Sequence, residues 1–181
     1  MKPIAKMSRA DLAAFVQEHL RAQGIDVVLC GGACISIYSQ GKYLSMDLDM
    51  IHTGLMAPKR SLIREVMKKM GFSEDGRHFK HSDTKLFVEF PKGPPAVGEE
   101  PVKEIRERRV ATGILKIISP TDCVKDRLTW FYHDHDQQCL AQAVLVAQAN
   151  QIDLKEVARW SEREGKSDLF KLIQARLKTK I

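Results

Sequence analysis

The sequence has no long apolar run, and no segment approaches the roughly 20 apolar residues that a membrane-spanning helix needs. Its N-terminal stretch, MKPIAKMSRADL, also lacks the apolar core of a secretory signal peptide. We therefore expect a cytoplasmic protein that does not bind a membrane.

Cysteines are few, and their spacing is not that of a metal site. The four of them, at positions 30, 34, 123 and 139, form no zinc-type pattern. In a chain without a secretion signal they are most simply reduced thiols of the core.

Several catalytic and nucleic-acid-binding signatures are absent as well. The chain contains no Gly-x-Ser-x-Gly elbow and no P-loop lysine pattern. Its net charge of +6 favours polyanionic partners, yet there is no arginine-rich run and no basic motif interleaved with aromatic residues. Charge alone therefore does not identify a nucleic-acid-binding protein.

The remaining pattern predicts an α+β fold with a mixed β-sheet flanked by helices. A length of 181 residues with 44% hydrophobic residues suits one ordinary domain with a small appendage. Apolar periodicity and turn residues predict three helices at 8–24, 33–40 and 62–70, and strands at 27–29, 46–50, 85–90, 105–111 and 114–118. Residues 77–90 are expected to form a hairpin that turns at Asp83. Residues 91–101, with four prolines and no periodicity, are expected to form a loop, either a lid or a passive connection.

From Ser119 the pattern becomes helical. Ser119 is a predicted N-cap, Pro120 occupies the first helical position, and Asp122 lies in the first turn. Three further apolar stripes follow, so we predict a core over residues 1–118 and a C-terminal helical segment over 119–181.

The stretch Val27–Ile51 carries the chemistry around which the chain is organised. A short apolar strand breaks at Gly31-Gly32, where residues without Cβ allow a sharp turn and a close backbone approach to a ligand. Free N–H groups at the start of the helix that follows would form an anion site. Taken alone, a Gly-Gly pair is more often an ordinary turn.

Two carboxylates follow on the next predicted strand. Asp47 and Asp49 share one strand face, roughly 7 Å apart along the strand, and Met46, Leu48 and Met50 share the other. Carboxylates this close repel unless a cation lies between them, and Mg²⁺ binds through one or two carboxylates plus substrate phosphates. An isolated Asp-x-Asp usually lies on a solvated strand edge. The prediction of a metal and phosphate site therefore depends on its combination with Gly31-Gly32.

Glu89 is the third candidate carboxylate. In the predicted strand Lys85–Phe90 it alternates with Val88 and Phe90, so it faces the side of Asp47 and Asp49 if the two strands are neighbours. The alternative is that this strand is an exposed edge and Glu89 faces water.

Gly31-Gly32, a short helix and then Ser45-x-Asp47-x-Asp49 resemble the signature of the polymerase-beta-like nucleotidyltransferase superfamily. Within it, the chain resembles the small bacterial nucleotidyltransferases of toxin–antitoxin and abortive-infection systems. The resemblance covers residues 25–92 and implies a third carboxylate, matched by Glu89. It also implies Mg²⁺ or Mn²⁺ as cofactor, a nucleoside triphosphate as donor, and a tRNA, other RNA end or protein hydroxyl as acceptor.

The resemblance also implies roles for the remaining site residues. Asp47, Asp49 and Glu89 would be catalytic and metal-binding, and the predicted nucleotide ligands are Gly31, Gly32, Ser45, Lys42, Lys125 and Arg127. Helix surfaces carry Lys and Arg as a matter of course, so the last two are equally well explained as solvated side chains. The predicted function is metal-dependent nucleotidyl transfer, and the alternative is a non-catalytic, antitoxin-like binding protein with the same fold.

One rival constellation is dense in potential metal ligands. His133-Asp134-His135-Asp136 contains the groups that a zinc or iron site would use. Residues two apart do not share a helical face, so we interpret this stretch as a turn between two helices.

Overall fold

The computed structural model describes residues 2–178, which form two compact units. The first comprises the chain up to Cys34, Ser45–Pro95 and Ile105–Ile118. The second comprises Ile35–Leu44, Ala96–Glu104 and the chain from Ser119 onward. The division at residue 118 that the sequence suggests stays a prediction. The last three residues of the predicted C-terminal segment, 179–181, lie outside the described part of the chain.

The first unit is built on a mixed seven-stranded sheet with the order β3-β4-β5-β2-β1-β9-β8. At its centre β2 runs antiparallel to β1 and parallel to β5, while β1 runs parallel to β9. The strands are β1 Val27–Cys30, β2 Asp47–His52, β3 Ser73–Asp75, β4 His78–Lys80, β5 Phe87–Glu89, β8 Ile105–Val110 and β9 Gly113–Ile118. The predicted α+β fold with a mixed sheet is confirmed.

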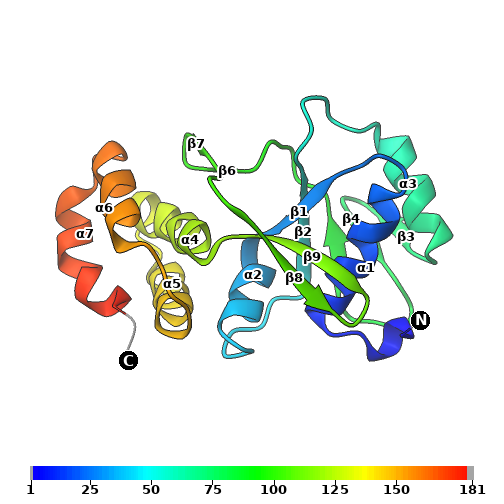
Figure 1. Ribbon diagram of the computed structural model, residues 1–181, viewed down its shortest axis with the longest axis horizontal. Helices are drawn as coiled ribbons and strands as arrows, with labels where there is room; N and C mark the ends of the chain where they lie inside the picture. Colours follow the sequence, from blue (N-terminus) through cyan, green and yellow to red (C-terminus); the bar gives the residue numbers. More distant parts are fainter. Residues whose placement is uncertain (1, 179–181) are drawn as a thin grey trace. The chain divides into compact units, whose positions relative to one another are not determined.

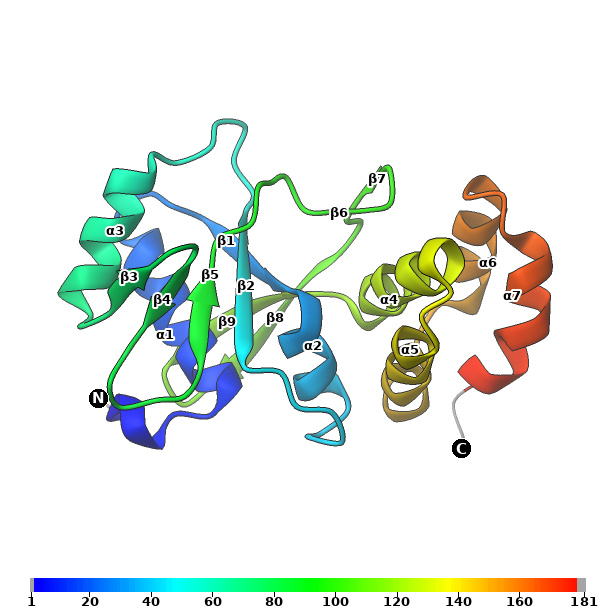
Figure 2. The same cartoon turned by 180° about the vertical axis from the view of Figure 1, so that it is seen from behind.

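Helix α1 (Arg9–Arg21) covers the apolar face of this sheet. Ser8 and Asp11 form the capping box that starts the helix. On its inner side Gln17 donates a 2.8 Å hydrogen bond to the Lys116 carbonyl and lies 3.7 Å from the Met50 sulfur. Met50 therefore points toward α1, and in Figure 2 strands β2 and β5 lie in front of this helix. Because side chains alternate along β2, Asp47 and Asp49 point to the opposite face.

Two helices and the predicted hairpin follow the expected order, and one 3-10 turn was not predicted (Figure 1). Helix α3 (Arg60–Lys69) ends before Gly71, whose φ of +88° suits a glycine at the end of a helix. Helix α2 (Gly31–Tyr38) starts two residues earlier than predicted, at the diglycine itself. A 3-10 turn, η1 (Ile4–Lys6), precedes α1. The predicted hairpin between residues 77 and 90 is present as β4 paired antiparallel with β5.

The second unit is mainly helical, as predicted. It contains α4 (Pro120–Asp134), α5 (Gln137–Ala149), α6 (Leu154–Arg163), α7 (Ser167–Ile173) and the 3-10 turn η2 (Gln174–Leu177). Ser119, Asp136 and Asp153 each cap the helix that follows with a side-chain oxygen. Trp160 stacks on Tyr132 with 5.7 Å between ring centroids, and the Tyr132 hydroxyl is 2.8 Å from the Ser161 hydroxyl.

Two short strand pairs were not expected from the sequence. Strands β3 and β4 form a hairpin around Gly76, whose φ is +60°, although Ser73–Asp75 shows no apolar alternation. Strands β6 (Ala96–Val97) and β7 (Glu100–Pro101) pair within the stretch predicted to be a loop, around Gly98 with a φ of +60°. Two- and three-residue strands are too short for an alternating pattern, so the turn glycines were the only local signal.

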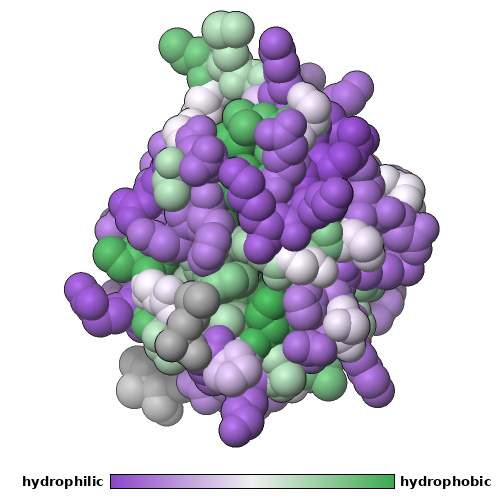
Figure 3. All heavy atoms as spheres, turned by 90° about the vertical axis from the view of Figure 1, so that its right-hand side faces the viewer, coloured by the Kyte–Doolittle hydropathy of each residue, from purple (hydrophilic) through white to green (hydrophobic). Residues whose placement is uncertain are grey.

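The cysteines, the helices and the surface can be compared with what the composition predicted. All four cysteines are buried and form no disulfide. None of the described helices combines the length and the apolarity needed to cross a membrane. The face of the first unit in Figure 3 is mainly hydrophilic, with small hydrophobic areas between charged and polar side chains.

Candidate active site

The three candidate carboxylates lie on two neighbouring central strands. In the parallel pairing of β2 with β5, Asp47 is opposite Phe87 and Asp49 is opposite Glu89. Paired residues of adjacent strands project to the same face, so Asp47, Asp49 and Glu89 share the face opposite the buried Leu48 and Val88. The strand register therefore places Glu89 on the same sheet face as Asp47 and Asp49, as the alternation of side chains predicted. The catalytic roles of the three residues stay a prediction.

Glu89 is not on an exposed edge. Strand β5 lies between β4 and β2, which overturns the alternative interpretation that this strand borders the solvent. The Glu89 carboxylate lies 3.1 Å from Nε of Arg77 and 3.4 Å from Nε2 of His78, its register partner on β4. Its side chain is only 16% exposed. The structure thus holds Glu89 in contacts with basic side chains that the sequence reasoning missed.

The donor set fits one divalent ion more readily than two. Within residues 2–178, no three His, Cys, Asp or Glu side chains are arranged to hold a metal ion together. Mg²⁺ commonly takes only one or two protein carboxylates and completes its shell with water and phosphate oxygens, which Asp47 and Asp49 can satisfy. Glu89 would have to leave Arg77 and His78 to join a second ion.

Gly31 is the backbone position that the site requires to be glycine. Its φ is +66°, and a Cβ built on it would lie 2.1 Å from Oδ2 of Asp49. The Asp49 carboxylate therefore packs directly against the first residue of α2. Gly32 follows in the first turn of the same helix. The close approach of Asp49 explains the glycine at position 31 independently of any phosphate.

Replacing Gly31 by alanine is expected to destabilise the protein by about 2–3 kcal/mol, because the new methyl group clashes with Asp49 and disfavours the left-handed backbone. Gly41 is the matched control, because it has a φ of +83° and no atom of residues 2–178 lies within 4 Å of the built Cβ. Gly41→Ala should cost only about 1 kcal/mol from the backbone. Urea denaturation of both variants measures the difference, and equal losses would show that Asp49 does not press on Gly31.

Ser45 positions the start of β2. Its hydroxyl accepts a 3.3 Å hydrogen bond from the Asp47 amide, and its carbonyl accepts a 2.6 Å hydrogen bond from Nε of Arg9 on α1. Arg9 was not predicted to matter for the site. Lys42 is exposed in the segment Ile35–Leu44 of the second unit. The nucleotide-binding roles of Ser45 and Lys42 stay predictions.

The prediction for Lys125 needs correction. Its side chain is 0% exposed, and its ammonium lies 2.8 Å from Asp122 and 3.2 Å from Glu156. Hydrogen bonds from Arg159, Lys103 and Lys125 hold the pKa of Glu156 well below its ordinary value, although burial opposes the shift. Lys125 thus links α4 to α6 inside the second unit and is not accessible to a triphosphate.

Arg127 is partly buried and already paired. Its Nη2 lies 2.5 Å from the carboxylate of its neighbour Asp126, and its side chain is 15% exposed. The charge of Arg127 is therefore compensated within α4, and its role toward a nucleotide stays a prediction.

The histidine-rich stretch forms the predicted turn between helices. His135 ends α4 with a left-handed φ of 56°, and Asp136 caps α5 through its side chain. His133 contacts Glu164 at 3.3 Å. The predicted inter-helix turn is therefore present at His135 and Asp136, whereas His133 and Asp134 are the last residues of α4.

Comparison with known proteins is informative only at the level of structure. No protein-family model matches the chain, and no curated protein matches it either. An antigenic nucleotidyltransferase-like protein from Paracoccidioides brasiliensis is similar with a TM-score of 0.59 at 12% identity, over 99% of this chain and 97% of that one.

Two structures of the antibiotic-resistance factor ANT(2'')-Ia are similar at lower scores. Its solution structure has a TM-score of 0.48 at 12% identity, over 88% of this chain and 92% of that one. Its complex with adenylyl-2''-tobramycin has a TM-score of 0.45 at 12% identity, over 90% and 94% of the two chains. At such identities only the similarity to the Paracoccidioides protein supports a conclusion, and that conclusion concerns architecture alone. This chain therefore has a nucleotidyltransferase-like α+β fold.

Proposed function

We propose that the protein is a metal-dependent nucleotidyltransferase that moves a nucleoside monophosphate from a nucleoside triphosphate to an acceptor hydroxyl. One observation carries the proposal: Asp47, Asp49 and Glu89 share a face of two adjacent central strands, beside a glycine that packs on Asp49. The nucleotidyltransferase-like fold supports it.

Different residues of the chain would bind the metal ion and the phosphates. Asp47 and Asp49 would hold Mg²⁺ or Mn²⁺, which neutralises charge on the phosphate oxygens when bound. Within residues 2–178 the Asp47 carboxylate has no hydrogen-bond or ion-pair partner, so it is available for this role. The amides at Gly31 and Gly32, with the Ser45 hydroxyl, would contact the leaving pyrophosphate. Lys42 would contribute positive charge toward the phosphates, and Arg127 would do so only after leaving Asp126.

Glu89 would act as the base that takes the proton of the acceptor hydroxyl, or would complete a second metal position. Either role requires its carboxylate to exchange the contacts with Arg77 and His78 for contacts with substrate or metal. The acceptor class that we propose is an RNA end, including that of tRNA, or a protein hydroxyl, with a toxin–antitoxin pair as the setting.

A thermal-melting assay tests the donor. ATP, CTP, GTP and UTP at millimolar concentration, each with Mg²⁺ or Mn²⁺, should include at least one that raises the Tm. A ligand at about 100 times its Kd adds about 2.7 kcal/mol when it binds only the folded protein. No shift with any of the four would reject nucleotide binding and with it the proposed transfer.

The second candidate is a non-catalytic binding protein that keeps the fold, for instance an antitoxin-like partner. The contacts of Glu89 with Arg77 and His78 favour it, because a carboxylate held in these contacts is not positioned to act as base or metal ligand. It predicts that nucleotide, if bound at all, is recovered unchanged after incubation with RNA and protein acceptors. Mass spectrometry of the acceptors after incubation with labelled nucleotides distinguishes the two functions.

A further inference from the structure

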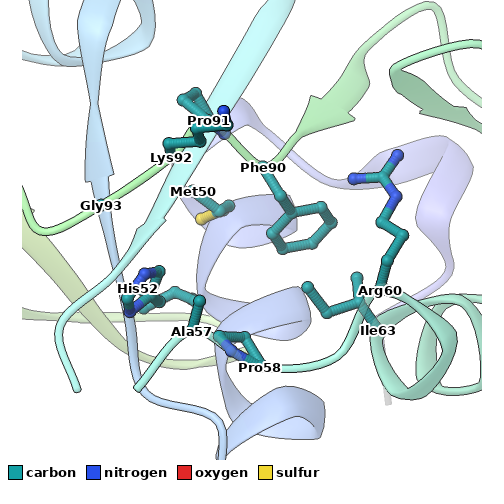
Figure 4. Close-up of a pocket in the computed structure, with 11 residues that line it drawn as sticks. Met50, His52, Ala57, Pro58, Arg60, Ile63, Phe90, Pro91, Lys92 and Gly93 are labelled. Carbon is teal, nitrogen blue, oxygen red and sulfur yellow. The ribbon is translucent and has the colours of Figure 1, made fainter. Parts of the chain in front are cut away.

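A pocket of about 500 Å³ opens in the first unit at the end of β2 that is remote from Asp47 (Figure 4). Strands β1 and β2 form its floor through Val27, Met50 and His52. Its walls are the loop before α3, the first turns of α3, and residues 90–93, which follow β5. In Figure 4 the ring of Phe90 and the side chain of Ile63 point into the space between these elements.

This pocket is not part of the carboxylate site. Met50 and His52 alternate with Asp49 along β2, and Phe90 directly follows Glu89 beyond β5. Alternation places Met50 and His52 on the sheet face that α1 covers, opposite the face of the carboxylates. A molecule in the pocket would therefore contact the sheet on the face opposite Asp49 and Glu89, without reaching either carboxylate.

The pocket is lined mainly by apolar side chains, together with basic side chains. Seven of the residues are apolar: Val27, Met50, Ala57, Pro58, Ile63, Phe90 and Pro91. Among the described residues no acidic side chain lines the pocket, whereas Arg60, Lys92 and His52 do. The Arg60 guanidinium is already paired, with Nε 2.9 Å from Glu74. Lys92 is exposed and has no ion-pair partner among residues 2–178, so its charge is available.

His52 adds a directional polar group. Its Nδ1 is buried and has no hydrogen-bond partner among residues 2–178. When the ring proton is on Nε2, the unpaired Nδ1 is an acceptor nitrogen and Nε2 is a hydrogen-bond donor. Gly93 fits against this side of the ring, because a Cβ built on it would lie 3.0 Å from Nε2 and 2.7 Å from the His52 carbonyl. The ring therefore presents a donor at the edge where residues 91–93 close the pocket.

We propose that this pocket binds a small molecule with an apolar, ring-sized body and a single anionic group, such as a hydrophobic carboxylate or sulfonate. Its volume lies within the roughly 300–1,000 Å³ range of small-molecule sites, which are mostly apolar with a few convergent polar groups. The apolar body contacts Met50, Ile63 and Phe90, while Lys92 pairs with the anion and His52 donates to it.

The neighbouring loop supports a site for an apolar ligand. Leu55 and Met56 precede Ala57 and Pro58 and are 107% and 87% exposed. Figure 3 shows hydrophobic atoms protruding at the top, at the height of the loop that joins β2 to α3 in Figure 1. A second hollow shares His52, Ala57 and Pro58 with the pocket and is also lined by Met56. The loop thus presents apolar side chains where an apolar ligand would enter.

Two fluorescent probes of matched shape test the proposal with the full chain. 8-Anilinonaphthalene-1-sulfonate carries the apolar body and one anion, and N-phenyl-1-naphthylamine carries the body alone. Lys92→Gln should weaken sulfonate binding about two- to fivefold, the effect of one exposed ion pair, and leave binding of the neutral amine unchanged. Lys85→Gln is the matched control, because Lys85 is exposed on the same segment but does not line the pocket.

Methyl NMR of the wild type locates the probe. Shifts at Val27, Ile63 and Met50 on adding the sulfonate support the pocket, and shifts confined to other methyl groups overturn it. Equal sulfonate affinity of wild type and Lys92→Gln overturns the assigned anion contact. The Tm rise with Mg²⁺ and nucleotide should be the same in wild type and Lys92→Gln, so this result is independent of the proposed transfer.

Discussion

Replacing Asp47 by asparagine is expected to reduce nucleotidyl transfer by at least about 10²–10³-fold, the scale seen when one group that stabilises transition-state charge is removed. The substitution keeps the shape of the side chain and removes one of the two charges that would hold the metal. Transfer of label from α-labelled nucleoside triphosphates to RNA and protein acceptors measures the loss.

Asp47→Asn should fold as well as the wild type. Within residues 2–178 the Asp47 carboxylate has no partner to lose, and relief of its repulsion from Asp49 would stabilise the metal-free protein slightly. Asp75→Asn is the matched control, because Asp75 is exposed and forms an ion pair with Lys80 on the β3–β4 hairpin. Full activity in Asp47→Asn would reject the mechanism, and failure to fold would assign Asp47 a structural role.

Glu89→Gln should lower transfer by orders of magnitude while nucleotide still raises the Tm. The base or second-metal role is lost, whereas Asp47 and the amides at Gly31 and Gly32 remain for binding. The Gln side chain also loses the ion pair with Arg77, so urea denaturation is measured beside activity. A Gln variant with full activity removes Glu89 from the mechanism.

Lys125→Met is expected to cost about 3–5 kcal/mol of stability, because it leaves buried carboxylates without their compensating charge. Asp122 is 2% exposed and lies 2.8 Å from the Lys125 ammonium. The loss should appear in urea denaturation. Lys155→Met makes the same change at an exposed position on α6 and should stay within about 0.5 kcal/mol of the wild type.

This variant also decides between the two roles considered for Lys125. A structural role predicts that Lys125→Met, studied well below its Tm, still shows a Tm rise with nucleotide and metal as large as that of the wild type. A stable Lys125→Met protein that has lost the nucleotide response would instead restore Lys125 as a nucleotide ligand.

Much of the local structure followed from short-range signals. Ser119 with Pro120 predicted the start of α4, because a capping side chain satisfies backbone N–H groups within its own turn. The alternation along residues 85–90 predicted the sheet face of Glu89, because successive side chains of a strand point to opposite faces. The prediction also required that this strand be the neighbour of β2. Capping and alternation both involve residues that are close in the chain.

Only the tertiary structure decided which charges meet. A helical pattern shows that Lys125 can lie on a surface, but its burial depends on Glu156 arriving from α6, 31 residues later. The contacts of Glu89 with Arg77 and His78 likewise depend on β4 pairing with β5. The pocket joins Val27, Ile63 and Phe90 from three separate elements. The sequence by itself determined the main helices, the longer strands, their faces and the candidate carboxylates, but not the short strands β3, β6 and β7. The partners of those charges came from long-range packing, for which a single sequence carries no periodic signal.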